Sequence, residues 1–266
     1  MARVLASGMS GSIGSALLPA LRRQGHEVTR LTRGAASGPG QIAWDPAKPL
    51  SPEAVSGFDQ VIHLAGESIA GRWTDSKKSR IRDSRVLGTR YLAEALAKAP
   101  ARPRVFLSAS AIGFYGDRHD EVLTEDSGSG TGFLPEVCRE WEAATRPAAE
   151  AGIRTAQIRT GIVLSGTGGA LQAMLTPFKL GLGGRIGTGR QWWSWIDIDD
   201  MVGAIQQILN DERMTGPFNL TAPAPVTNVE FTKVLASVLS RPANFPMPTF
   251  AARLAFGQMG EYPPIR

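Results

Sequence analysis

The sequence contains a single cysteine, Cys138, and only three histidines, His26, His63 and His119. One cysteine cannot form an internal disulfide or a cysteine metal cluster, and we interpret Cys138 as a small buried residue. The histidines lie far apart, and none has the helical spacing of a metal-binding pair. The sequence therefore predicts no metal site.

Long apolar runs and a strong charge bias are also missing. No segment approaches the roughly 20 apolar residues that span a bilayer, and the first residues are typical of a strand rather than of a signal peptide. We therefore expect a cytoplasmic protein with no membrane partner. The net charge is only +5, and the basic residues between Lys77 and Arg104 belong to no recognised nucleic-acid-binding module, so we expect no nucleic-acid partner.

Short apolar runs alternate with helical repeats along the chain. Strands are predicted at 3–7, 28–31, 60–64, 105–108 and 155–159, and helices at 13–21, 74–99, 136–151, 170–178, 201–209 and 228–239. This alternation predicts an α/β fold with a Rossmann-type doubly wound parallel sheet. Residues 1–160 would form the Rossmann core. Residues 161–266 would add a smaller C-terminal substrate lobe and segments that complete the core, the whole forming one structural unit.

The first predicted turn carries three glycines, Gly8, Gly11 and Gly14, between a strand and a helix. At this spacing the first glycine allows a sharp turn, the second a close approach to a pyrophosphate, and the third tight packing of the helix. The helix N-terminus adds N–H groups and a partial positive charge, which favour phosphate. We therefore predict dinucleotide binding, with a merely structural turn as the alternative. The predicted contacts are Gly8, Ser10, Gly11, Ser12, Ile13 and Gly14.

The second predicted strand ends at Thr32 and Arg33. It lacks the acidic residue that holds the ribose 2′-hydroxyl in NAD-selective sites. Because a cation at this point suits a 2′-phosphate, the predicted cofactor is NADP(H). An ordinary exposed arginine is the alternative.

These glycines, together with the segments 63–67, 108–117 and 195–200, resemble the short-chain dehydrogenase/reductase superfamily in its extended form. A narrower similarity, to an atypical branch known as the NAD-dependent epimerase/dehydratase family, rests on Leu64-Ala65-Gly66-Glu67, Ser84-Arg85, the segment 159–164 and the segment 181–184. The resemblance implies that the cofactor site is also lined by Leu64, Ala65, Gly66, Arg85, Ser108 and Arg159. For the two arginines, a surface salt bridge is the alternative.

The resemblance fails at the superfamily's catalytic pair. Typical members carry Tyr-x-x-x-Lys on one helical face, where the lysine lowers the pKa of the tyrosine. The chain contains no such motif, and Leu134 and Cys138 occupy the expected positions. Ser110 lies near the superfamily's catalytic serine and Tyr115 is the nearest phenol, so these two residues are the catalytic candidates.

Three carboxylates are further candidates for proton transfer, namely Glu67, Asp197 and Asp199. Burial would raise the pKa of Glu67 and suit it to act as an acid. The tryptophans between 192 and 195 would wall a flat substrate pocket or pack the lobe.

Two interpretations of the function follow. The first is an NADP(H)-dependent oxidoreductase or epimerase acting on a hydroxyl- or carbonyl-bearing small molecule. In it, Ser110 binds the substrate oxygen and Tyr115 or a carboxylate handles the proton. The second is a non-catalytic NADP(H)-binding sensor or partner-binding module, which fits an intact cofactor site without the Tyr/Lys pair. The charged predicted helices favour a monomer without fixing the oligomeric state.

Overall fold

The computed structural model describes residues 1–36 and 38–248, so the last part of the predicted C-terminal lobe lies outside the described residues. Its centre is a seven-stranded sheet in the order β10-β6-β5-β4-β1-β2-β3. All six strand pairs of this sheet are parallel. The strands are β1 (Arg3–Ser7), β2 (Glu27–Arg33), β3 (Gln41–Trp44), β4 (Gln60–His63), β5 (Val105–Ala111), β6 (Arg154–Thr160) and β10 (Gly216–Leu220).

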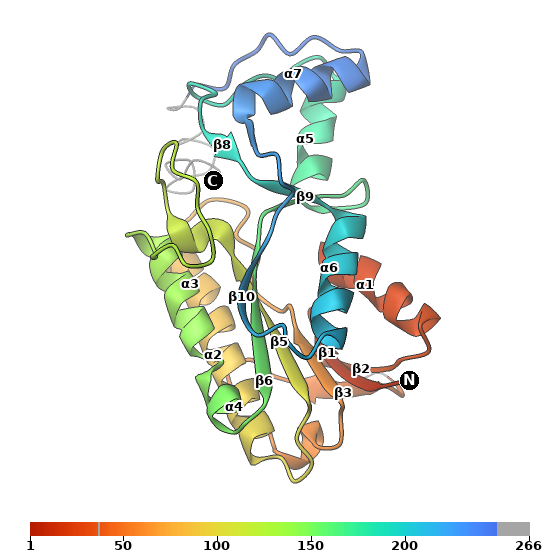
Figure 1. Ribbon diagram of the computed structural model, residues 1–266. Helices are drawn as coiled ribbons and strands as arrows, with labels where there is room; N and C mark the ends of the chain where they lie inside the picture. Colours follow the sequence, from red (N-terminus) through yellow and green to blue (C-terminus); the bar gives the residue numbers. More distant parts are fainter. Residues whose placement is uncertain (37, 249–266) are drawn as a thin grey trace.

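The chain builds the sheet outward from β1 in two directions, because β2 and β3 lie on one side and β4, β5 and β6 on the other. Helices α1 (Ser12–Arg23) and α6 (Ile198–Asn210) cover one face. Helices α2 (Asp75–Lys98), α3 (Phe133–Ala143) and α4 (Arg146–Glu150) cover the other, as Figure 1 shows. Buried aliphatic side chains fill both interfaces. The predicted doubly wound Rossmann-type fold is therefore confirmed.

The single helix predicted over 136–151 is wrong, because the structure has two helices, α3 and α4, with a break between them. Pro147 has no N–H to continue the helical ladder, and it sits in the first turn of α4, where no such bond is needed. The Thr145 hydroxyl donates to the Glu142 carbonyl at 2.7 Å, which competes with the helical bond there.

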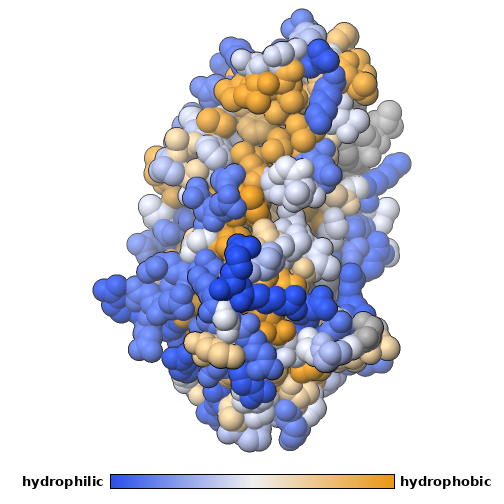
Figure 2. Space-filling model, turned by 90° about the vertical axis from the view of Figure 1, so that its right-hand side faces the viewer, coloured by the Kyte–Doolittle hydropathy of each residue, from blue (hydrophilic) through white to orange (hydrophobic). Residues whose placement is uncertain are grey.

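A smaller lobe stands over the carboxyl ends of the strands (Figure 1). Its helices are α5 (Gly169–Lys179) and α7 (Asn228–Leu239), and its short strand pairs are β7 (Ile162–Leu164) with β9 (Trp195–Asp197) and β8 (Trp192–Trp193) with β11 (Val226–Thr227). Figure 2 shows apolar side chains gathered on the upper part of one face, and the exposed Val234 and Val238 belong to α7. Single-turn helices occur at η1 (Glu53–Val55) and η2 (Ile112–Tyr115).

Six strands were not predicted, namely β3 and β7 to β11. Most have two to four residues, too few for an alternating pattern. Strand β10 contains Pro217, which is tolerated because β10 is the edge strand of the sheet. Within the described part of the chain, no helix combines the length and apolarity needed to cross a membrane.

Candidate functional site

The glycine turn between β1 and α1 rests directly on the segment that follows β4. Gly8 has φ +75°, and a Cβ built on it would lie 2.5 Å from the carbonyl carbon of Leu64 and 2.7 Å from the backbone nitrogen of Ala65. The Leu64 N–H donates to the Ser7 carbonyl at 3.3 Å. Only glycine satisfies both the conformation and the contact. Two segments that sequence analysis assigned to one site are therefore in contact.

The other two glycines differ in how tightly they are packed. A Cβ on Gly14 would lie 2.3 Å from the Gly8 carbonyl oxygen and 2.5 Å from the Met9 Cα, so the start of α1 is pressed onto the turn. A Cβ on Gly11 would meet only the Gly8 carbonyl oxygen, at 3.4 Å. Gly11 is also the N-cap of α1, without a side-chain cap and without an acidic residue in the first turn. The positive end of the helix dipole is therefore uncompensated beside an open backbone.

Thr32 and Arg33 end β2, the strand that neighbours β1. The Thr32 hydroxyl donates to the Ile42 carbonyl at a long 3.5 Å. Arg33 is exposed and stands in register with Trp44 of β3. Ser10, in the glycine turn, is also exposed. The structure thus places the Arg33 cation at the carboxyl edge of the sheet, one strand away from the turn.

Arg85 reaches from α2 to the segment after β4. Its guanidinium donates to the carbonyls of Glu67 at 3.0 Å and Ile81 at 3.1 Å, and it stacks 5.1 Å from the Trp141 ring centre. A Cβ on Gly66 would lie 3.3 Å from its Cζ. Burial lowers the pKa of Arg85, although a guanidinium stays charged near neutral pH. The side chain is a half-buried cation held by backbone carbonyls, not the surface salt bridge of the alternative interpretation.

The expectation of a raised pKa for Glu67 is wrong. Lys77 donates to its carboxylate at 2.8 Å, and Arg80 lies 3.6 Å away. The hydrogen bond from Lys77 is the main cause that holds the pKa of Glu67 below its usual value. Because both partners stabilise the ionised form, this carboxylate is not suited to act as an acid near neutral pH.

A buried polar cluster occupies the carboxyl ends of β5 and β6. The Ser110 hydroxyl donates to Glu142 of α3 at 2.6 Å. Arg159 makes two hydrogen bonds to the same carboxylate, each 2.9 Å, and its guanidinium lies 3.6 Å from the Phe114 ring centre. The side chain of Arg159 is 5% exposed and that of Glu142 is 15% exposed. Ser110 was predicted as a catalytic candidate, and Arg159 as a cofactor contact with a surface salt bridge as the alternative. The ion pair of Arg159 is buried rather than on the surface. The role of Glu142, which lies one turn after Cys138 on α3, was not predicted.

Tyr115 belongs to the same cluster and is fully buried. Its hydroxyl donates to the Asn219 side-chain oxygen at 2.7 Å and accepts from Arg159 at 2.9 Å. The backbone N–H of Asn219 in turn donates to Glu125 at 2.8 Å. The phenolic proton is thus directed at β10. Nothing in the sequence pattern signalled the contribution of Asn219.

His63, at the end of β4, is completely buried. Its Nδ1 shares a 2.6 Å hydrogen bond with the Ser7 hydroxyl, and its ring meets Trp44 edge to face at 5.6 Å. Burial lowers the pKa of His63 to about 4. The ring is therefore neutral, and it binds the side chain of Ser7, the residue immediately before the glycine turn. Ser108 is also buried, and its hydroxyl donates to the adjacent Ala109 carbonyl at 3.3 Å.

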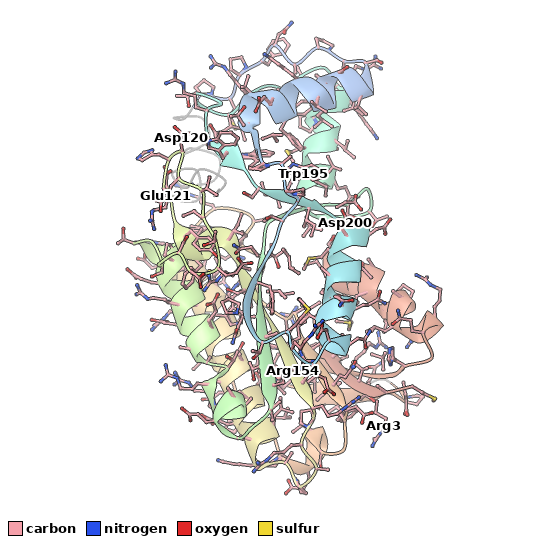
Figure 3. All side chains as sticks on the ribbon, viewed as in Figure 1. Arg3, Asp120, Glu121, Arg154, Trp195 and Asp200 are labelled. Carbon is pink, nitrogen blue, oxygen red and sulfur yellow. The ribbon has the colours of Figure 1, made fainter. Side chains whose placement is uncertain are left out.

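The lobe residues singled out in the sequence have structural contacts: one caps a helix, one packs inside the lobe and one joins the lobe to the core. Asp197 is the N-cap of α6 and accepts from the Asp199 N–H at 2.8 Å. Trp193 is buried against Phe231, with ring centres 4.8 Å apart. The Trp192 indole donates to Asp120 at 2.9 Å, and Figure 3 shows Asp120 on the loop that reaches up to the lobe. The 116–132 loop therefore ties the core to the lobe.

The strand order reverses between β1 and β4, and the glycine turn follows β1 at this point. A doubly wound parallel sheet with a glycine turn at this position defines a Rossmann-type α/β protein. The family model described as "NAD dependent epimerase/dehydratase family" matches residues 4–220. The chain belongs to this family, which confirms the resemblance noted in the sequence.

Individual relatives cover nearly the whole chain. The Epimerase family protein Mb2239 of Mycobacterium bovis is 43% identical over 260 residues, which cover 97% of this chain and 86% of the relative. The crystal structure of the human epimerase family protein SDR39U1 (isoform 2) with NADPH is 36% identical, with a TM-score of 0.88, covering 96% of this chain and 86% of that one. A structure named as the nucleoside-diphosphate sugar epimerase of Corynebacterium glutamicum is 44% identical, with a TM-score of 0.80, covering 95% of this chain but 54% of that one.

Proposed function

We propose that the chain binds NADP(H) and uses it in the oxidoreduction or epimerisation of a small molecule bearing a hydroxyl or carbonyl group. The observation that carries the proposal is the close contact of Gly8 with the backbone of Leu64 and Ala65, next to a start of α1 that has no side-chain cap. This arrangement leaves N–H groups and a partial positive charge for a pyrophosphate. The NADPH in the human relative's structure supports the choice of cofactor.

The start of α1, Arg33 and Arg85 each have a proposed task toward the cofactor. The first-turn backbone of α1 binds the pyrophosphate, and Arg33 pairs with the 2′-phosphate. Arg85 places a cation beside Gly66, where it interacts with the ribose or the phosphates. When bound, the nicotinamide supplies hydride transfer. The described elements of the lobe, α5, α7 and the short strand pairs, contribute the substrate side, since the lobe stands over the carboxyl ends of the strands.

Ser110 is a stronger candidate than Tyr115 for contact with the substrate. Its proton is directed at Glu142, so its lone pairs remain available to accept a hydrogen bond from a substrate hydroxyl. The Tyr115 hydroxyl has both its donor and an acceptor position engaged by Asn219 and Arg159. In our proposal, Ser110 orients the substrate oxygen and Glu142 fixes the direction of the Ser110 hydroxyl.

Cofactor selectivity tests the role of Arg33. Replacing Arg33 by leucine is expected to weaken NADPH binding by about tenfold or more, because a charge-assisted contact to the 2′-phosphate is lost. NADH binding should not change, since NADH carries no 2′-phosphate. Calorimetric titration of both cofactors into wild type and variant measures the two affinities. Wild-type protein with equal affinity for NADPH and NADH would remove the argument from Arg33, and absence of binding by either would refute the proposal.

A non-catalytic NADP(H)-binding sensor is the second candidate function. Two observations favour it, namely the lack of a Tyr-x-x-x-Lys motif and the confinement of Tyr115 in the buried cluster.

Turnover separates the two functions. An oxidoreductase oxidises NADPH with a member of a panel of carbonyl compounds, and NADPH absorbance gives its rate. An epimerase regenerates its cofactor in every cycle, so its rate is measured by chromatography of a sugar nucleotide and its epimer, the substrate class suggested by the name of the Corynebacterium relative. The Ser110→Ala variant should then lose most of this rate while keeping its NADPH affinity. Ser56→Ala is a control outside the proposed site, because Ser56 precedes the amino end of β4 and its hydroxyl accepts from the Ala101 N–H at 3.1 Å. NADPH binding without turnover of any compound would favour the sensor.

A further inference from the structure

The N-terminus of α5 faces the N-terminus of α1 across Ser12. A Cβ built on Gly168 would lie 3.4 Å from the Ser12 Oγ, and one built on Gly169 would lie 3.6 Å from it. Figure 1 shows α5 above the start of α6, and α6 packs beside α1. The lobe therefore reaches the glycine turn through the short segment 165–169, which follows β7 and ends at the first residue of α5.

The Ser12 hydroxyl indicates a ligand-binding position between these two helix ends. Its oxygen is buried and has no hydrogen-bond partner among the residues that the structure describes. Buried hydroxyls are nearly always paired, because an unpaired one loses its hydrogen bonds to water without replacement. A phosphate oxygen next to Ser12 would accept the hydrogen bond that this hydroxyl lacks.

The electrostatics of α5 favour an anion at the same place. The helix has 11 residues, its N-cap is Gly168 without a side-chain cap, and its first turn contains no acidic residue. The start of α1 likewise has a glycine N-cap, Gly11, without a side-chain cap, and no acidic residue in its first turn. Two uncompensated positive helix ends that approach each other repel unless an anion lies between them.

We propose that the segment 165–169 forms the second wall of the pyrophosphate site, so that α1 and α5 hold the cofactor's phosphates from two sides. The proposal rests on the proposed NADP(H) binding and extends it to the lobe. The ligand class is a dinucleotide with a bridging pyrophosphate. Because α5 belongs to the lobe, cofactor binding would also fix the lobe against the core.

Two substitutions at Gly168 isolate the charge at this helix end. Gly168 has φ 178°, an extended conformation that any residue adopts, and an added Cβ there meets its neighbours at ordinary contact distances. Asparagine and aspartate are both good N-cap residues of the same size. Only Gly168→Asp places a negative charge next to the pyrophosphate. We expect Gly168→Asp to bind NADPH about tenfold or more weakly than Gly168→Asn, with both variants at least as thermally stable as wild type.

A second ligand keeps the test specific. Adenosine 2′-monophosphate carries the 2′-phosphate but no pyrophosphate, so both variants should bind it with the same affinity as wild type. Equal NADPH affinity of the two variants would overturn the proposal that the segment 165–169 contacts the pyrophosphate. An equal loss of affinity for NADPH and for adenosine 2′-monophosphate in Gly168→Asp would also overturn it. Wild-type protein that binds neither ligand would instead refute the proposed function. If wild-type protein binds both ligands, the proposed NADP(H) binding stands, and the two variants then test only the role of the segment 165–169.

Discussion

Replacing Glu142 by leucine is expected to lower the free energy of unfolding by about 3–5 kcal/mol, the usual consequence of removing one partner of a buried ion pair. The substitution leaves the Arg159 guanidinium, which is 5% exposed, without its carboxylate. It also removes the acceptor of the Ser110 hydroxyl. Urea denaturation followed by circular dichroism measures the change.

The exposed neighbour Glu140 provides the matched control. It pairs with Arg82 at 2.6 Å on the surface between α3 and α2, so Glu140→Leu should change the free energy of unfolding by about 1 kcal/mol or less. The double variant Glu142→Leu with Arg159→Met should regain most of the lost stability, since no unpaired charge remains buried. If Glu142→Leu destabilises no more than Glu140→Leu, the cluster does not support the fold.

The core was predictable because its signals are local. The apolar run of β1 and the spacing of Leu17 and Leu21 in α1 depend on residues within a few turns of each other, and both side chains are fully buried. The glycine turn was predictable for the same reason, since its three glycines serve one turn. Local patterns therefore determine the elements that position the proposed cofactor site.

The polar cluster was only partly predictable, because it depends on the order of strands in the sheet. Tyr115 meets Asn219 across 104 positions of sequence, and β10 was not predicted because Pro217 and Asn219 interrupt its apolar character. The pKa of Glu67 was wrongly expected to be raised for a similar reason. Its partner Lys77 lies ten residues away across a loop, and no periodic pattern relates two such positions.

Gly14→Ala is expected to destabilise the protein by about 1–3 kcal/mol and to abolish NADPH binding. Alanine normally favours a helix over glycine, but here the new Cβ would lie 2.3 Å from the Gly8 carbonyl oxygen and 2.5 Å from the Met9 Cα. Both are backbone atoms, so α1 must move away from the turn. Thermal denaturation and NADPH titration of the same preparation measure the two effects.

Gly11→Ala should separate ligand contact from packing. The Gly11 backbone is extended, and its added Cβ would meet only the Gly8 carbonyl oxygen at 3.4 Å, so stability should fall by no more than about 1 kcal/mol, the penalty of alanine at an N-cap. NADPH affinity should nevertheless fall by about tenfold or more, because the methyl group occupies the space into which the pyrophosphate approaches. A Gly11→Ala variant that binds NADPH as tightly as wild type would show that the phosphates lie elsewhere. In that case Gly8 and Gly14 would serve only to pack the turn against the segment after β4 and α1 against the turn.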